Sequence, residues 1–107
     1  MIKVFVYGSF MRNGRYHQHY LQGTTFLGDG YIEGYKKYIL GGLSGILPEE
    51  GERVQGEVYE IEPAKLAKLD FFQNYGTTFT RGMVDVKLGN GATLPAEAYI
   101  WTGSVGK

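Results

Sequence analysis

The stretch Ile2–Tyr7 (IKVFVY), followed at once by Gly8, Ser9 and Phe10, is the part of the sequence that says most about the fold. A run this short, apolar and β-branched predicts a buried strand, because a strand with one face in solvent shows polar alternation. Gly8 lets the backbone bend sharply and lets a ligand approach closely. Consecutive backbone N–H groups in such a turn can form an anion-binding concavity. The Tyr7–Phe10 turn is therefore either an ordinary strand end or a site for a carboxylate or carbonyl oxygen.

The overall composition indicates one globular domain over residues 1–107. The chain has no cysteine, which excludes disulfides and thiolate zinc sites and leads us to expect a cytoplasmic location. No apolar run approaches the roughly 18 residues that a membrane span needs. Eleven basic residues balance eleven acidic ones, which argues against nucleic acid or an anionic membrane as the main partner.

Hydrophobic periodicity and turn residues predict the remaining elements. The first part of the chain is expected to contain a short helix over residues 15–22 ended by Gly23, strands over 24–40 with bends or bulges at Gly28, Gly30 and Gly34, and a loop over 41–52. The second part is expected to contain a strand over 53–61, a helix from Pro63 to about Gln73, and a strand pair over 77–88 and 92–101 joined at Gly89–Gly91, with Pro95 marking a bulge or an edge. Many short strands with one or two helices indicate an α+β protein with a closed or partly closed sheet, because closure removes unpaired edges.

Metal or cofactor binding is not expected from this sequence. His17 and His19 would share a face on a strand but not on a helix, and no third ligand is evident nearby. We therefore interpret the two histidines as surface residues. The sequence does not predict an oligomeric state.

Four motifs follow one another along nearly the whole chain. They are VFVYGSF (Val4–Phe10), GEVYEI (Gly56–Ile61), LAKLDFF (Leu66–Phe72) followed by Gln73, and FTR (Phe79–Arg81). In this order and spacing, from residue 2 to about residue 101, the chain resembles the γ-glutamylcyclotransferase-like family, which includes γ-glutamylamine cyclotransferase and the AIG2-like proteins. The resemblance implies a mixed, partly closed β-barrel with one or two flanking helices, in agreement with the predicted elements.

The resemblance also implies an activity on γ-glutamyl amines or amides. The substrate's own α-amine attacks the γ-carbonyl and 5-oxoproline is released, a lyase or transferase reaction. The site must anchor the α-carboxylate, present N–H donors to the carbonyl oxygen, and supply a carboxylate for proton transfer. The residues that the resemblance implies for substrate binding are Tyr7, Gly8, Ser9, Phe10, Phe79, Arg81 and Trp101. We expect Tyr99 to face away from Trp101, with one of the two meeting the pocket.

Position 73 departs from the family pattern at the catalytic residue. The family's catalytic Glu follows L-D-x-x, and this chain has Gln73 there, whose carboxamide has no basic lone pair for a general base. The family's Tyr before x-Arg is Phe79, while Arg81 is retained. We therefore expect a γ-glutamylcyclotransferase-like protein that is weak or inactive in this reaction. The alternative is a non-catalytic module that binds small carboxylates or γ-glutamyl groups through the Tyr7–Phe10 turn.

Three explanations for Gln73 remain open, so the sequence does not decide whether the chain is an enzyme. Gln73 is an engineered change, or a natural member has lost the chemistry and kept the pocket, or another carboxylate substitutes. Phe79 favours natural divergence, since a single engineered change would not alter it. The candidate substitutes are Asp70, on nearly the same helical face as Gln73, and Glu57, which points either into a barrel or to solvent. Asp70 is also interpretable as a structural hydrogen-bonding residue near the helix end.

Overall fold

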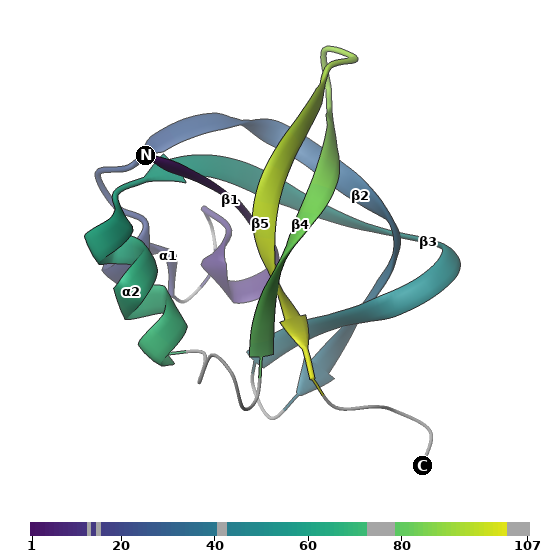
Figure 1. The fold of residues 1–107 in the computed structure, drawn as a ribbon, viewed down its shortest axis with the longest axis horizontal. Helices are drawn as coiled ribbons and strands as arrows, with labels where there is room; N and C mark the ends of the chain where they lie inside the picture. Colours follow the sequence, from purple (N-terminus) through teal and green to yellow (C-terminus); the bar gives the residue numbers. More distant parts are fainter. Residues whose placement is uncertain (13, 15, 41–42, 73–78, 103–107) are drawn as a thin grey trace.

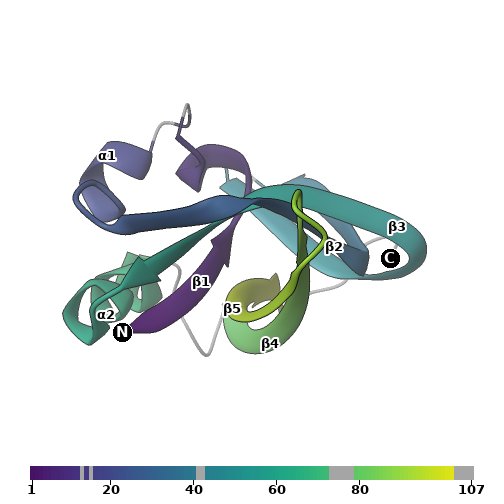
Figure 2. The same cartoon turned by 90° about the horizontal axis from the view of Figure 1, so that it is seen from above.

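Five strands form a closed β-barrel in the order β1-β3-β2-β4-β5, and the two helices lie together on one side of it (Figures 1 and 2). The computed structural model describes residues 1–12, 14, 16–40, 43–72 and 79–102. Its elements are β1 (Ile2–Val6), the 3-10 turn η1 (Gly8–Phe10), α1 (His17–Tyr20), β2 (Thr25–Leu40), β3 (Leu43–Ile61), α2 (Pro63–Phe72), β4 (Phe79–Leu88) and β5 (Thr93–Trp101). The predicted α+β class and mixed barrel are confirmed, since β1 and β5 pair parallel and the other pairs are antiparallel.

Strand β1 has neighbours on both edges and packed layers on both faces, which explains its apolar sequence. It pairs antiparallel with β3 along its whole length and parallel with β5 at Val4 and Glu97. Its side chains alternate between two clusters of buried residues, and Val4 and Phe5 are fully buried on opposite faces. The prediction of a buried strand from IKVFVY is confirmed.

The two clusters divide the core into an inside and an outside of the barrel. The interior cluster draws on all five strands and consists of Phe5, Tyr7, Ile32, Ile46, Val54, Val58, Val84, Val86, Ala96 and Ala98. The outer cluster lies between the barrel and the helices and consists of Val4, Val6, Phe10, Leu21, Tyr59, Ile61, Leu66, Leu69, Phe79 and Tyr99. Burial of apolar surface on both faces of the same strands supplies the main driving force for this small fold.

The predicted loop over residues 41–52 is wrong from Leu43 onward, because Leu43–Pro48 pair with β2 and residues 49–52 continue the same strand, β3. Residues 41 and 42 lie outside the described part of the chain. The Gly- and Glu-rich part that suggested a loop is a large bulge, in which residues 49–52 lie opposite Gly34. Gly34 (φ +85°) and Gly51 (φ +88°) adopt backbone conformations that other L-residues rarely take. The bulge bends the hairpin without ending it, so β2 and β3 continue past it and curve around the barrel (Figure 1).

The other turn signals had mixed outcomes. The predicted strands over residues 24–40 are one long strand, Thr25–Leu40, with a bulge at Gly28 as predicted and none at Gly30, which pairs in register with Gly56. Of the two alternatives predicted for Pro95, a bulge or an edge, the bulge is excluded, because Pro95 pairs in regular register with Asp85. The edge alternative agrees with the structure in one respect. The pairing of β5 with β1 is at Glu97, so on its β1 side Pro95 lies beyond this pairing.

Helix α2 begins at the residue that the sequence singles out, whereas α1 (His17–Tyr20, C-cap Leu21) is shorter than the predicted helix over residues 15–22 and ends before Gly23. Pro63 opens α2, where its missing N–H costs nothing, and Leu66 and Leu69 are the buried residues of this helix. Gly23 (φ +82°) follows the short helix α1. Gln73 and residues 103–107 lie outside the described part of the chain. Among the described residues, no helix is long and apolar enough to cross a membrane.

Candidate functional site

The Tyr7–Phe10 turn is a single 3-10 turn at the end of β1, and it requires glycine at position 8. Gly8 has φ +62°, and a Cβ there would lie 2.2 Å from the Oγ of Ser44. A side chain at position 8 would therefore meet both backbone strain and a steric clash. The hydrogen bonds made within the turn leave the N–H groups of Gly8 and Ser9 unused by the turn itself. This geometry fits the predicted anchor for an anionic or carbonyl oxygen.

Buried hydrogen bonds hold the turn at its upstream end. The Tyr7 hydroxyl donates to the backbone oxygen of Tyr99 at 2.5 Å and accepts from the backbone N–H of Ile46. Burial raises the pKa of Tyr7 well above its ordinary value, so the hydroxyl stays protonated and keeps this bond. The turn is thus tied to β5 and to the start of β3.

The ring of Phe10 packs among aromatic side chains beside the helices. Its centroid lies 5.6 Å from Tyr16 and 5.9 Å from both Tyr20 and Phe72. Its backbone oxygen lies 3.1 Å from Nδ1 of His17, so one histidine of the predicted surface pair supports the turn. Among the described residues, no group of three or more His, Cys, Asp or Glu side chains is placed to hold a metal ion.

Glu57 is the only charged side chain among the described residues that is buried, and it anchors the segment after the turn. Its carboxylate accepts from the Arg12 backbone N–H at 2.9 Å, from Arg12 Nε at 3.1 Å and from the Tyr59 hydroxyl at 2.8 Å. Burial and the bond to Glu57 raise the pKa of Tyr59 above its ordinary value. Arg12 was not among the predicted site residues, and neither alternative predicted for Glu57, barrel interior or solvent, describes its position.

Gly56 of the GEVYEI motif has a steric role beside Glu57. A Cβ at position 56 would lie 2.3 Å from the backbone oxygen of Val6 and 2.5 Å from the ring of Phe5. Glycine therefore allows β1 and β3 to approach closely where the turn begins. The motif residues Gly56, Glu57 and Tyr59 act together in placing the turn against β3.

Asp70 and Arg81 form a second group of charges, between α2 and the β4–β5 hairpin. Arg81 donates to Asp70 through Nε at 2.9 Å and Nη2 at 3.2 Å, and through Nη1 to Glu97. The Tyr99 hydroxyl donates to Asp70 at 2.5 Å. Burial alone would lower the pKa of Arg81, but the bonds to both carboxylates raise it, and burial with the bond to Asp70 raises that of Tyr99. Asp70 therefore has the structural hydrogen-bonding role that the sequence analysis considered for it.

The remaining predicted site residues lie in the outer cluster. Phe79 is 1 % exposed there, and Trp101 packs against the same cluster as Tyr99. The expectation that Tyr99 and Trp101 face opposite sides is wrong, because residues two apart on a strand share a face. The structure brings the Tyr7–Phe10 turn to Tyr99, and through the Tyr99 hydroxyl to Asp70 and Arg81, whereas Gln73 lies outside the described residues.

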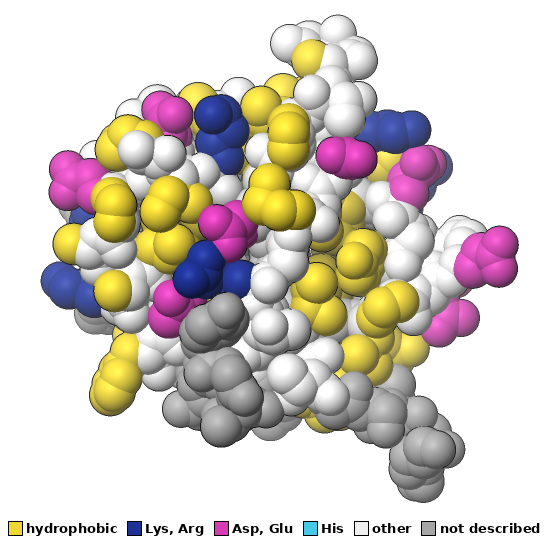
Figure 3. Space-filling view, viewed as in Figure 1, with side chains coloured by type: hydrophobic (Ala, Val, Ile, Leu, Met, Phe, Trp, Pro, Cys, Tyr) yellow, Lys and Arg dark blue, Asp and Glu magenta, His cyan; other side chains and the backbone are white. Residues whose placement is uncertain are grey.

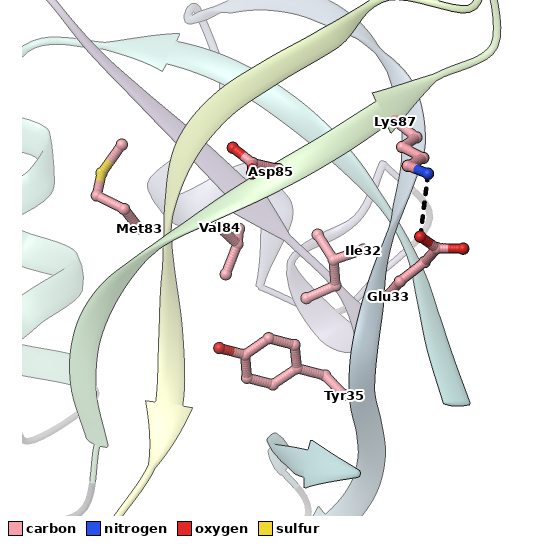
Figure 4. A pocket seen from close by; sticks show the side chains of 7 residues that line it. All are labelled: Ile32, Glu33, Tyr35, Met83, Val84, Asp85 and Lys87. Atoms are coloured by element: carbon pink, nitrogen blue, oxygen red, sulfur yellow. Dashed lines mark ion pairs between the residues drawn. The ribbon is translucent and has the colours of Figure 1, made fainter. Parts of the chain in front are cut away.

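A cleft of about 330 Å³ lies away from these residues, where β2 and β4 diverge. The two strands pair at Gly30–Tyr31 and Lys87–Leu88, and beyond this point Ile32 and Tyr35 of β2 face Val84 of β4 across the cleft (Figure 4). None of the predicted site residues lines it.

Charged side chains of both signs are interspersed on the described part of one molecular face, which agrees with the balanced composition (Figure 3).

Comparison with known proteins points to one family. Residues 4–107 match the family described as "Gamma-glutamyl cyclotransferase, AIG2-like". The chain is 36 % identical over 89 residues to the gamma-glutamylcyclotransferase family protein YtfP of Escherichia coli K12, covering 83 % of this chain and 77 % of that protein. It is 30 % identical over 109 residues to a putative gamma-glutamylcyclotransferase of Methanocaldococcus jannaschii, covering 96 % of this chain and 87 % of that protein.

Solved structures give the same result for the fold. The crystal structure of a mouse AIG2-like protein matches with a TM-score of 0.88 and 26 % identity, covering 98 % of this chain and 80 % of that one. An uncharacterized protein from Pyrococcus horikoshii matches with a TM-score of 0.75 and 27 % identity, covering 97 % of this chain and 80 % of that one. The match of nearly the whole chain, together with the two relatives, shows that this protein belongs to the γ-glutamyl cyclotransferase, AIG2-like family.

Proposed function

We propose that this protein binds γ-glutamyl compounds through the Tyr7–Phe10 turn and that its release of 5-oxoproline is weak or absent because position 73 is Gln. The observation that carries the binding half is the turn itself, held by Tyr7 and with Gly8 in a conformation that needs glycine. The N–H groups of Gly8 and Ser9, which the hydrogen bonds within the turn do not use, suit the α-carboxylate or the γ-carbonyl oxygen of such a substrate. Membership of the γ-glutamyl cyclotransferase family supports this choice of ligand.

The reaction itself needs little from the protein besides orientation and proton transfer. The substrate's α-amine nitrogen forms a bond to the γ-carbonyl carbon, and the bond from that carbon to the leaving amine nitrogen breaks. One proton moves from the attacking nitrogen to the leaving nitrogen, and the products are 5-oxoproline and the free amine. Holding amine and carbonyl together supplies part of the rate by proximity, and a carboxylate suits the proton transfer.

The carboxylates that were candidates to replace the family's Glu have other partners. Asp70 accepts two bonds from Arg81 and one from Tyr99, and Glu57 accepts three from Arg12 and Tyr59. Three donors occupy most of the roughly four acceptor sites of each carboxylate and hold it in place, away from a role with substrate. This supports loss of the chemistry at position 73 over substitution by another carboxylate.

The test is an assay of 5-oxoproline release from γ-glutamyl amines by the chain as it stands and by Gln73→Glu. We expect little or no turnover from the first and a gain of about 100- to 10,000-fold from the second, the range that general acid–base catalysis contributes. Gln73→Ala is the matched control and should remain inactive. Phe79→Tyr, which restores the family hydroxyl without a base, should not restore turnover by itself. Robust turnover by the unchanged chain would contradict the proposed inactivity.

The second candidate, a non-catalytic module for small carboxylates, rests on the same turn. An NMR titration with acetate and with a γ-glutamyl amide separates the two. Amide shifts at Gly8 and Ser9 with both ligands, and no turnover even by Gln73→Glu, would favour the binding module. Selective binding of the γ-glutamyl compound with turnover by Gln73→Glu would favour a cyclotransferase ancestry of the site.

A further inference from the structure

We propose that Glu57 is a positioning residue that fixes the downstream end of the Tyr7–Phe10 turn through Arg12, and that ligand binding at the turn depends on it. The inference rests on the proposed function for its ligand and on the geometry of the described residues for its mechanism. It assigns a role to the one buried charge of the described chain.

The first step is the environment of the carboxylate. The side chain of Glu57 is 4 % exposed, and a buried carboxylate is costly unless donors compensate it. Both oxygens are engaged, Oε1 by the Arg12 N–H and the Tyr59 hydroxyl and Oε2 by Arg12 Nε. A carboxylate so enclosed and so fully bonded is suited to hold a segment in place and poorly suited to accept a substrate proton.

The second step is where the held segment lies. The N–H of Arg12 comes two residues after Phe10, so its bond to Glu57 fixes the backbone directly beyond the turn onto β3. The upstream end is fixed by the Tyr7 hydroxyl on β5 and β3. With both ends held, the directions of the Gly8 and Ser9 N–H groups are set before a ligand arrives, which lowers the ordering cost of binding.

The third step is that the Arg12 side chain has several partners besides Glu57. Its guanidinium donates to Asp29 at 3.1 Å and lies 4.3 Å from the centre of the Phe26 ring, both on β2. The segment after the turn is thus fastened to two adjacent strands. Glu57 supplies the acceptor for both the backbone and the side chain of Arg12, so it is the residue whose change should release the turn.

The experiment begins with the unchanged chain, in which the Arg12 amide should exchange slowly with solvent. Glu57→Gln is then compared with Glu60→Gln, the same chemical change on the same strand, where the carboxylate meets Lys3 at 3.9 Å instead of the turn. We expect Glu57→Gln to shift the Gly8 and Phe10 amide signals and to speed exchange at Arg12, and Glu60→Gln to leave all three unchanged. Fast exchange in the unchanged chain, or unaltered signals in Glu57→Gln, would overturn the proposal.

The second readout is the dissociation constant of a γ-glutamyl amide, measured by NMR titration. Glu57→Gln should weaken binding about tenfold or more, as expected when hydrogen bonds to a charged group are lost. Val86→Ala, in the interior cluster, is the control for general destabilisation and should bind as the unchanged chain does. Equal weakening in both variants would leave only a structural role and contradict the inference. No binding by the unchanged chain would refute the proposed function, while the amide signals would still decide the role of Glu57.

Discussion

Glu57 on β3 and Asp70 on α2 are held by the same kinds of group, yet they stabilise different parts of the molecule. Each carboxylate accepts from one arginine and from one tyrosine hydroxyl. The Glu57 side chain is 4 % exposed and also accepts a backbone N–H, whereas the Asp70 side chain is 21 % exposed and has side-chain donors. Glu57 therefore fixes a local backbone segment, and Asp70 fixes whole elements to one another.

The difference shows how sequence separation determines what an ion pair does. Glu57 connects β3 to the segment that follows the first strand, at a separation of 45 residues, and so acts on the turn. Asp70, Arg81 and Tyr99 connect α2, β4 and β5, which places the helix against the barrel. In both places donors hold the carboxylate, which agrees with the proposal that proton transfer depends on the residue type at position 73.

The largest expected effect is alkaline unfolding, which removes the tyrosine partner of both carboxylates. The pKa values of Tyr59 and Tyr99 are raised in the folded protein, so their contribution to stability is complete below the unfolded value of about 10. Above that pH the unfolded chain loses these protons first, and the free energy of unfolding falls as pH rises. Urea unfolding across this range should show the fall, and Tyr59→Phe and Tyr99→Phe should each flatten it. If the dependence of the unfolding free energy on pH were the same in both variants as in the unchanged chain, the raised pKa values of Tyr59 and Tyr99 would be refuted.

Next in size is Glu57→Ala, which leaves the donors of Arg12 and Tyr59 without their acceptor. We expect the free energy of unfolding to fall by about 3 kcal/mol, because the buried Tyr59 hydroxyl and the part-buried Arg12 N–H groups would lose their acceptor. Urea unfolding monitored by tryptophan fluorescence measures it. If Glu57→Ala lowered the free energy of unfolding by less than Asp70→Asn does, the difference in side-chain exposure would not explain how the two sites differ.

Asp70→Asn should have a smaller effect. Asparagine keeps one oxygen for Arg81 or Tyr99 and loses the charge, and the site is partly exposed, so we expect a loss of about 1.5 kcal/mol. The same unfolding measurement applies, with Glu97→Gln as the companion variant at the other carboxylate that Arg81 contacts. An increase in stability would show that the charge is held at a net cost.

The smallest effect is expected at Glu33, whose pair with Lys87 gives a baseline for exposed ion pairs. The two side chains are 51 % and 49 % exposed at a separation of 3.0 Å. Solvent screens such a pair, so Glu33→Gln should leave the melting temperature unchanged within error. A clear loss there would mean that the cleft between β2 and β4 depends on this contact.

The parts of the fold that follow local rules could be predicted from the sequence. IKVFVY gave β1, Pro63 gave the start of α2, and Gly28 and Gly34 marked real bulges. Residues 43–52 could not be predicted as a strand, since their Gly, Pro and Glu residues are typical of a loop. Only the pairing of β3 with β2 makes them part of a strand.

The backbone turn of the candidate site could be predicted from the sequence, but the side chains that hold it in place could not. Gly8 at the end of an apolar strand indicates a tight turn whatever surrounds it. Arg12 carried no signal of its own, because its importance comes from Glu57, which is remote in sequence. Tyr99 was predicted to lie on the opposite face of the strand from Trp101. This prediction was avoidable, because residues two apart on a strand share a face.

The sequence by itself determined the barrel family and the turn at Tyr7–Phe10, because each depends on residue types at short spacing. It is also the basis of the proposal that Gln73 stands where the family has a catalytic Glu. Only the tertiary structure decided the roles of the two carboxylates Glu57 and Asp70. Glu57 and Asp70 could each have been a base, an exposed charge or an anchor, and the choice depends on donors brought from β4, β5 and the segment after β1. Electrostatic roles depend on three-dimensional neighbours and burial, and neither is encoded in local sequence.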